Sequence, residues 1–259
     1  MKIKLVPAEP VDFAARGVVL LDPDVAVDPA GPEWFVRAAR TFRENVRSRE
    51  YPCHFGRQSL ERRELMVTHA ELADLRPLAD ALAFFLDNTP RVRGGRHVLS
   101  AFLRPSASTL STGVGGPSHD DHDRAFWEVL QYLHDHDPEP WPEGFPMDTE
   151  DPSWEFCFNG EAMFVFGAAP THGLRASRNL ADCLVLLFQP RSVFFGIEGG
   201  TAAGIVARKR IRERLRAWDL AGPHPSMGNY GDPSNVEWRQ YFIPDDDSDL
   251  HGECPFKAA

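Results

Sequence analysis

The stretch WEFCFNGEAMFVFG (residues 154–167) decides the fold of this chain. Two short apolar segments, WEFCF and AMFVFG, are separated by Asn159, Gly160 and Glu161. An Asn-Gly pair between two apolar runs is a strong signal for a β-hairpin. The sequence therefore predicts antiparallel pairing here, and we expect the remaining strands to extend a sheet that contains this hairpin.

Periodic apolar residues outside the hairpin predict the other elements. Further strands are expected at 65–69, 96–103 and 183–190. Helical spacing of apolar residues predicts helices at 32–47, 77–88, about 120–135 and about 203–218. In the last helix we expect four side chains to face inward, namely Ile205, Ile211, Leu215 and Trp218.

Strands and helices are intermixed along the chain, and the hairpin requires antiparallel neighbours. The pattern predicts an α+β fold in which one mainly antiparallel sheet carries helices packed on it. We expect a single catalytic domain over residues 31–259, preceded by a Pro- and Asp-rich N-terminal arm over residues 1–30. No Gly-rich loop opens a helix, so the pattern does not indicate a dinucleotide or P-loop site.

Composition limits the classes of function. The 259 residues carry a formal net charge of −10, which argues against a general nucleic-acid binder. No run approaches the ~20 apolar residues of a membrane span, and the N-terminus has no signal-peptide core, so a cytoplasmic location is expected. The four cysteines form no CxxC pair, which argues against a structural zinc site.

The segment PTHGLRASR (residues 170–178) follows the hairpin and is the strongest candidate site. Arg175 and Arg178 follow His172 at steps of three, so the three side chains would share a face of a helical turn. An imidazole with two forked cations suits a metal-bearing cofactor that carries two carboxylates, and haem meets that description. The alternative is a surface histidine beside solvent-exposed arginines.

Three other segments carry chemistry-bearing residues. Cys53 in YPCHFG could serve as a nucleophile or a metal ligand, or be an inert loop cysteine. The clusters HDDHD and HDHD flank one predicted helix and lie ~22 Å apart, so they form either separate metal sites or polar helix ends. The basic run at 207–218 interleaves with apolar residues and predicts a solvated amphipathic face.

The C-terminal segment at 224–242 mixes polar, acidic and aromatic residues. It contains His224, Tyr230, Asp232, Asn235, Glu237 and Trp238. Such a mixture can line a pocket for a polar, nitrogen-bearing substrate, or it can form a packed flap.

Several of these stretches, taken in order, resemble the YqcI/YcgG family. The matching pieces are YPCHFGRQS, FWEVLQYLHDHDPEPWP, WEFCFNGEAMFVFGAAPTHGLRASRN, FQPRSVF, IRERLRAWD and HPSMGNYGDPSNVEWRQYF. The resemblance covers the chain from about residue 35 to residue 243. Some similar proteins, such as those of the D-cycloserine and guanitoxin pathways, are haem-dependent N-hydroxylases of natural-product and antibiotic biosynthesis.

The resemblance implies a haem-dependent monooxygenase that hydroxylates a side-chain guanidine or amine nitrogen of an amino acid. The first expectation is conversion of L-arginine to N-omega-hydroxy-L-arginine, with haem b as the iron cofactor and an electron donor or peroxide as partner. A non-catalytic haem-binding protein and a metal-dependent hydrolase using His119 and His122 are the alternatives.

The same resemblance suggests roles for individual residues. His172 would be the axial ligand of the iron, with Cys53 and His224 as rivals. Arg175, Arg178 and Arg191 would contact the cofactor. The expected substrate-binding residues are Glu155, His224, Tyr230, Asp232 and Glu237.

Overall fold

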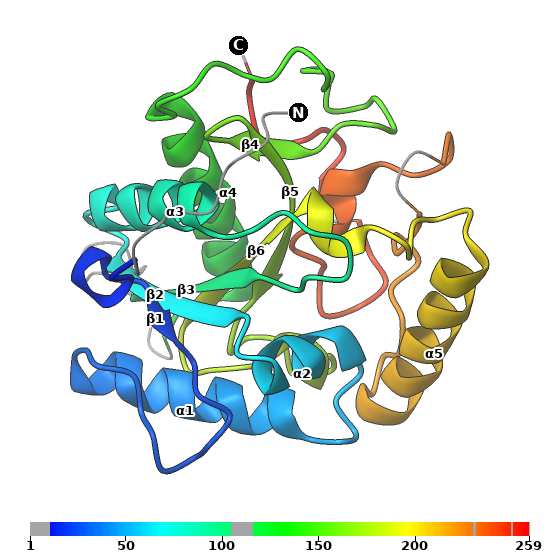
Figure 1. The fold of residues 1–259 in the computed structure, drawn as a ribbon. Helices are drawn as coiled ribbons and strands as arrows, with labels where there is room; N and C mark the ends of the chain where they lie inside the picture. The colour runs from blue at the N-terminus through cyan, green and yellow to red at the C-terminus, as the bar shows by residue number, and fades with distance from the viewer. Residues whose placement is uncertain (1–10, 105–115, 230–231, 250, 259) are drawn as a thin grey trace.

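The computed structural model describes residues 11–104, 116–229, 232–249 and 251–258. Its centre is one six-stranded sheet with the order β1-β2-β3-β6-β5-β4 (Figure 1). The strands are β1 Val19–Leu20, β2 Leu65–Glu71, β3 Val98–Arg104, β4 Phe156–Phe158, β5 Glu161–Ala168 and β6 Leu184–Pro190. All neighbours are antiparallel except β2 and β3, which confirms the predicted α+β class with a mainly antiparallel sheet.

The predicted hairpin is present as β4 and β5. Phe158 pairs with Glu161, so Asn159 and Gly160 form a two-residue turn. Both turn residues have positive φ angles, 52° and 72°, which is the backbone that an Asn-Gly pair adopts most readily. The local sequence therefore fixes both the turn and the register of this edge of the sheet.

Five α-helices are described around the sheet. They are α1 Glu33–Arg47, α2 His54–Glu61, α3 Arg76–Asn88, α4 His119–Asp135 and α5 Ala202–Trp218. Four of them match predicted helices. The fifth, α2, was not predicted, because Pro52 and Gly56 make this short segment look like a turn in the sequence. Among the described residues, none of these helices has the length and apolar character needed to cross a membrane.

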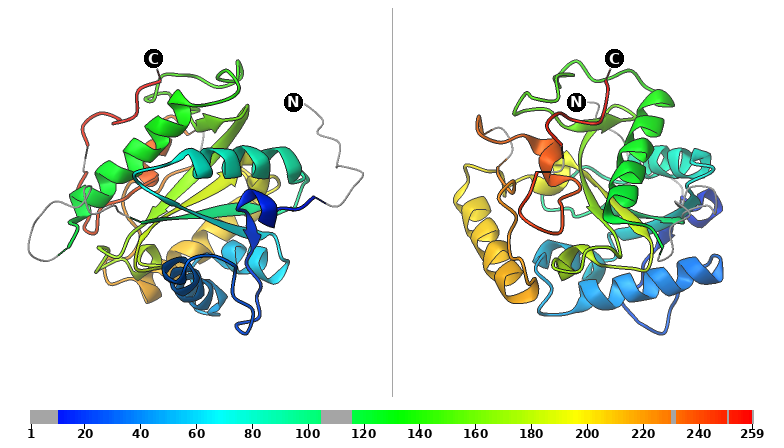
Figure 2. Two further views of the ribbon diagram at one scale, coloured as in Figure 1. Left: turned by 90° about the vertical axis from the view of Figure 1, so that its left-hand side faces the viewer. Right: turned by 180° about the vertical axis from the view of Figure 1, so that it is seen from behind.

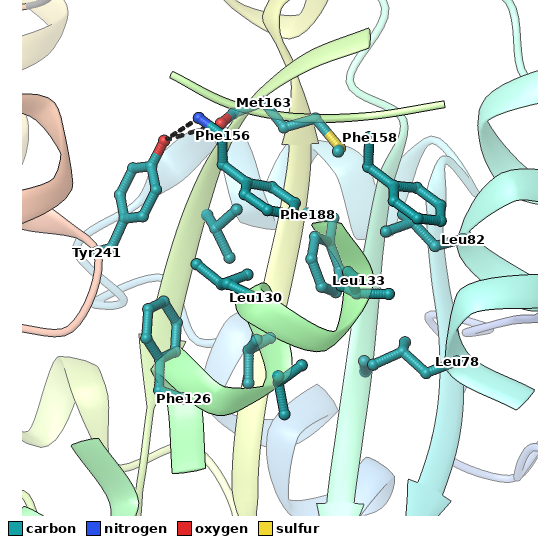
Figure 3. Packing of buried hydrophobic residues seen from close by; sticks show 14 of the residues in the cluster. Leu78, Leu82, Phe126, Leu130, Leu133, Phe156, Phe158, Met163, Phe188 and Tyr241 are labelled. Atoms are coloured by element: carbon teal, nitrogen blue, oxygen red, sulfur yellow. Dashed lines mark hydrogen bonds between the residues drawn. The ribbon is translucent and has the colours of Figure 1, made fainter. Parts of the chain in front are cut away.

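The helices pack on both faces of the sheet, with α3 and α4 on one and α1 and α2 on the other (Figures 1 and 2). Figure 3 shows the α3/α4 side, where Leu130 and Leu133 of α4 lie close to Phe188 of β6. Tyr241 closes this core, because its hydroxyl donates to the Met163 carbonyl at 3.0 Å and accepts from the Phe156 N–H at 3.1 Å. Burial of these groups on both faces stabilises the sheet.

Helix α5 lies at the periphery of the molecule (Figure 1). The prediction that Ile205 faces inward is wrong, because 56% of this residue is exposed. The prediction for Leu215 is confirmed, Ile211 and Trp218 are half-buried, and Gly204 is buried in the first turn. A β-carbon at Gly204 would clash with the carbonyl oxygens of Glu198 and Ile197, so glycine allows the close approach that sets the rotation of α5.

Candidate functional site

A cavity of about 300 Å³ lies between α5 and the sheet. The sheet contributes Phe164 and Phe166 of β5 with Leu187 of β6, and the start of α2 contributes Phe55. The walls are mainly apolar, as they are in pockets for small molecules and cofactors. On the order of twenty waters would fill this volume, so the cavity has room for a ligand larger than one amino acid.

Arginines interrupt the apolar walls. Six of them line the cavity, namely Arg96, Arg175, Arg178, Arg191, Arg208 and Arg212. Four of these six, Arg96, Arg178, Arg208 and Arg212, donate to carbonyl oxygens and form no ion pair with a carboxylate of the described residues. Guanidiniums that border an apolar space without a direct ion-pair partner favour an anionic ligand.

Cys53 lines the cavity at the N-terminal end of α2. Burial raises the pKa of its thiol, while the N–H groups of Gly56 and Phe55 and the guanidinium of Arg96 act in the opposite direction. A helix N-terminus and a cation both stabilise a thiolate. Because burial is the largest of these effects, the pKa of Cys53 is raised and the thiol form is favoured, while the two N–H groups and Arg96 are in place to stabilise a thiolate if a metal binds.

His172 lies outside the cavity lining. Its side chain is buried, with Nε2 at 2.9 Å from the Ile243 carbonyl oxygen and Nδ1 at 3.1 Å from the Ala169 carbonyl oxygen. Burial lowers the pKa of this imidazole to about 4. A neutral imidazole donates from one ring nitrogen only, so one carbonyl accepts from His172 and the other lies against the unprotonated nitrogen. Because a carbonyl oxygen lies in front of each nitrogen and neither reaches the cavity, the geometry does not support the expected role of His172 as an iron ligand.

The two arginines of the same loop also serve the fold. Arg175 donates to the carbonyls of Pro244, Gly222 and Asp246 and pairs with Asp247 at 2.7 Å. These contacts use most of its five N–H groups. The role expected for Arg175, pairing with a cofactor carboxylate, is therefore not supported, and the side chain instead holds the segment 244–247 in place.

Arg178 is buried within the same arrangement. Its guanidinium donates to the carbonyls of Gly167, Tyr241 and Gln240 at 2.9, 2.7 and 2.9 Å and lies over the Phe166 ring at 3.8 Å. Burial lowers the pKa of Arg178 to about 9. We call residues 169–179 the carbonyl-binding loop, because His172, Arg175 and Arg178 all contact backbone carbonyls of residues 240–246.

A second buried polar cluster forms part of the cavity wall. Arg191 donates to Glu155 at 2.5 Å, and both Arg191 and Glu237 line the cavity. Glu237 accepts from Asn235 at 3.0 Å and from Gln240 at 3.4 Å. We call Glu155, Arg191 and Glu237 the acidic wall. It brings together two of the expected substrate-binding residues and one expected cofactor residue.

The other expected substrate residues do not join this wall. His224 is buried outside the cavity, where Nδ1 accepts from the Ser226 N–H at 3.1 Å and Nε2 lies 3.2 Å from the Ser248 carbonyl oxygen. Asp232 is exposed and accepts from the N–H and hydroxyl of Ser234. The geometry thus supports neither as a ligand of the cavity, and Tyr230 lies outside the described residues.

The cluster HDDHD begins α4. Ser118 and Asp121 form a capping box there, so part of the acidic run stabilises the helix end. Asp123 turns inward and meets His251 Nε2 at 2.7 Å. His122 Nδ1 lies 3.2 Å from the Thr171 hydroxyl. In the described ranges no three His, Cys, Asp or Glu side chains are grouped so as to hold a metal ion.

Sequence reasoning missed three cavity arginines. Arg208 and Arg212 belong to the basic run that we predicted to be solvated, and Arg96 precedes β3. The sequence of α5 did carry a signal for this position. Arg208 and Arg212 are four residues apart and therefore share a helix face, and that face also carries small or apolar residues, namely Gly204, Ala207, Ile211 and Leu215. Only the packed helix shows that this face borders a cavity.

Comparison with known proteins supports the resemblance noted above. The chain is 35% identical over 231 residues to YcgG and 33% identical over 229 residues to YqcI, both of Bacillus subtilis (strain 168). Each match covers 87% of this chain and 88% of the relative.

A third relative is the Streptomyces lavendulae protein named "Putative N(omega)-hydroxy-L-arginine synthase DcsA". It is 29% identical over 209 residues, which cover 80% of this chain and 77% of the relative. No solved structure matches the chain. The family model for YqcI/YcgG matches residues 42–257, and the chain therefore belongs to the YqcI/YcgG family.

Proposed function

We propose that this protein is a haem-dependent N-hydroxylase that acts on the guanidine or amine nitrogen of a cationic amino acid, with L-arginine as the first substrate to test. The observation that carries the proposal is the cavity itself, because it combines apolar walls, unpaired arginines, a cysteine and an acidic wall. The name of the Streptomyces lavendulae relative supports the choice of reaction.

The cavity lining fits the chemistry of haem. A porphyrin has a flat apolar body and two carboxylates, and the cavity offers aromatic walls with guanidiniums that form no direct ion pair with a described carboxylate. Arg96 Nε is buried without a hydrogen-bond partner among the described residues, so this cation retains an unused donor. Arg96, Arg208 and Arg212 are the side chains that we expect to hold the propionates.

Cys53 is the proposed iron ligand. Of the three expected ligands, it alone lines the cavity, whereas the ring nitrogens of His172 and His224 are occupied by contacts with the backbone. A bound metal deprotonates a coordinating thiol, and the N–H groups of Phe55 and Gly56 would stabilise the resulting thiolate. When bound, haem with a thiolate ligand would supply oxygen activation.

The acidic wall is the proposed binding site of the substrate cation. A carboxylate presents two oxygens that match the fork of a guanidinium, and Glu237 presents its carboxylate at the cavity surface. Arg191 and Gln240 flank it and would fix its orientation. The apolar walls would exclude bulk water from the reacting nitrogen.

The overall reaction balances with a reductant or with peroxide. With oxygen, one atom enters the N–H bond to give N–OH, and the other leaves as water after uptake of two electrons and two protons. With hydrogen peroxide, one oxygen atom of the peroxide is inserted and the other is released as water. Either route replaces one N–H bond by N–OH and leaves the carbon skeleton intact.

Spectra and product analysis test the proposal. The protein purified after growth with a haem precursor should show haem absorption, and carbon monoxide should give the ferrous protein the strongly red-shifted band of a thiolate ligand. Cys53→Ser should remove that band, whereas the matched His172→Gln variant should keep it. Incubation with L-arginine, oxygen and a reductant, or with peroxide, should give a product with one added oxygen.

Three results would contradict parts of the proposal. A colourless protein after haem supplementation would refute the cofactor. Loss of the band in His172→Gln but not in Cys53→Ser would refute the ligand. Stable haem without product from any cationic amino acid would favour a non-catalytic haem-binding protein.

A further inference from the structure

The acidic wall places two buried carboxylates beside one guanidinium. Glu155 is fully buried, and only its Oε1 accepts from Arg191. Its Oε2 is buried and has no hydrogen-bond partner among the described residues. Glu237 is 4% exposed, and the hydrogen bonds that it receives from Asn235 and Gln240 both reach its Oε2.

The charges in this cluster do not balance. If both carboxylates are ionised, the cluster carries one excess negative charge. Within the described part of the chain, Tyr241 and Cys157 also interact with these carboxylates, and neither carries a positive charge. Toward solvent, Glu198 interacts with Arg191 and with Arg93, so the Arg93 cation is matched by a carboxylate outside the cluster. An unbalanced buried charge costs several kcal/mol, so the cluster requires either a proton or an added cation.

The pKa directions agree with the geometry. Burial raises the pKa of Glu155 to about 8, although Arg191 lowers it. Burial likewise raises the pKa of Glu237 to about 7, against the lowering effects of Arg191 and Asn235. When like charges approach each other in a buried site, one of the two groups stays protonated.

We propose that Glu155 and Glu237 share one proton while no cation occupies the cavity, and that a guanidinium or ammonium head binding at Glu237 displaces this proton into solvent. The inference rests on the proposed class of substrate but not on haem. The incoming cation then supplies the positive charge that the proton supplied before, so the cluster is neutral in both states.

The exchange has two consequences for recognition. The affinity for the cation increases as the pH rises, by up to about tenfold per pH unit. The increase ends at the pH where the shared proton dissociates even from the ligand-free protein. A neutral analogue of the same shape gains nothing from the acidic wall, because it cannot replace the proton. The wall would therefore select L-arginine over L-citrulline, whose urea group carries no charge.

Calorimetry measures the number of protons released when the cation binds. L-arginine is titrated into the purified protein at pH 7 in two buffers with different enthalpies of ionisation, and the difference gives the number of protons released. We expect about one proton per arginine bound. Glu155→Gln should reduce this number to near zero, because the remaining Glu237 is balanced by Arg191.

Glu198→Gln is the matched control. It is the same change at another carboxylate that lines the cavity, but this carboxylate is exposed and accepts from the Gly196 N–H. The control should release the same number of protons as the unchanged protein. Arginine binding without proton release, or equal release in Glu155→Gln, would overturn the inference while leaving the proposed function intact.

Infrared spectroscopy tests whether the ligand-free protein carries the shared proton. The protein at pH 6 should show the C=O stretch of a buried protonated carboxyl group, and this band should be absent from Glu155→Gln. Absence of the band from the unchanged protein would overturn the inference. If the band is present but no cationic amino acid binds, the proposed substrate class and the proposed displacement both fail, and only the shared proton remains.

Discussion

The carbonyl-binding loop and the acidic wall are both buried, polar and built around arginines, but they differ in how their hydrogen bonds are completed. In the loop, Arg178 donates to three backbone carbonyls, and the two ring nitrogens of His172 face two more. In the wall, Glu155 Oε2 has no described partner, and Glu237 borders an open cavity.

This difference separates a structural cluster from a candidate site. Buried polar groups that are satisfied within the protein stabilise one arrangement of the backbone. Buried polar groups left unsatisfied beside a cavity retain the capacity to bind a ligand. Arginine content alone does not distinguish the two cases, because both clusters contain this residue.

The largest expected effect comes from the loop. Arg178→Met would remove three charge-assisted hydrogen bonds from a buried site, although the Tyr241 carbonyl keeps the Gly167 N–H as a donor, so we expect a loss of about 3–5 kcal/mol in the free energy of unfolding. Urea unfolding measures this loss. Arg191→Met is the matched control and should cost less, because Glu155 and Glu237 already share one proton and can take up a second when the guanidinium is removed. An equal or greater loss in Arg191→Met would contradict the comparison.

The next effect is a loss of stability in acid that depends on His172. Its pKa is lowered from the ordinary 6.5 to about 4, so the unfolded state binds more protons between these values and stability falls as the pH drops from 6.5 to 4. The expected loss is about 3 kcal/mol. Denaturant unfolding at several pH values should show this slope, and His172→Gln should flatten it. An unchanged slope in this variant would assign the loss to other groups.

The acidic wall predicts that stability depends on pH with the opposite sign. The pKa of Glu155 is raised from 4.5 to about 8, so the folded state binds more protons in this window and stability falls as the pH rises through it. Between pH 6 and pH 8 the expected loss is about 2 kcal/mol. Glu155→Gln should remove most of this loss in the same unfolding series. A protein whose stability is level from pH 6 to pH 8 would contradict the raised pKa.

The smallest effect is expected at Asp232. This exposed carboxylate accepts hydrogen bonds from the N–H and the hydroxyl of Ser234 in the same turn, and it lies outside the cavity lining. Asp232→Asn should therefore leave L-arginine affinity unchanged, whereas Glu237→Gln should weaken it. Calorimetric titration of both variants makes the comparison, and a similar loss in both would show that the ligand contacts the 232–235 turn.

Much of the fold could be predicted because its signals are local. The Asn159-Gly160 pair determines a two-residue turn, and the 3.6-residue spacing of apolar side chains determines four helices. Helix α2 was not predictable in this way, since eight residues that contain Gly56 carry little periodic signal. The rotation of α5 depends on the close contact at Gly204, which involves residues before the helix begins.

The candidate site was predictable only in part. The sequence indicated that Cys53, Glu155, Arg191 and Glu237 carry chemistry, and the structure brings all four to the cavity or its wall. The segment 170–178 has a more conspicuous pattern, yet its donors are used by carbonyls some seventy residues away in the chain.

The sequence by itself determined the family, the hairpin, most of the helices and the residue types available for catalysis, because each depends on neighbours close along the chain. Only the tertiary structure decided which of the buried arginines, histidines and carboxylates have partners. Whether a buried polar group is satisfied depends on atoms that long-range packing brings within about 3 Å of it, and no local pattern encodes that distance.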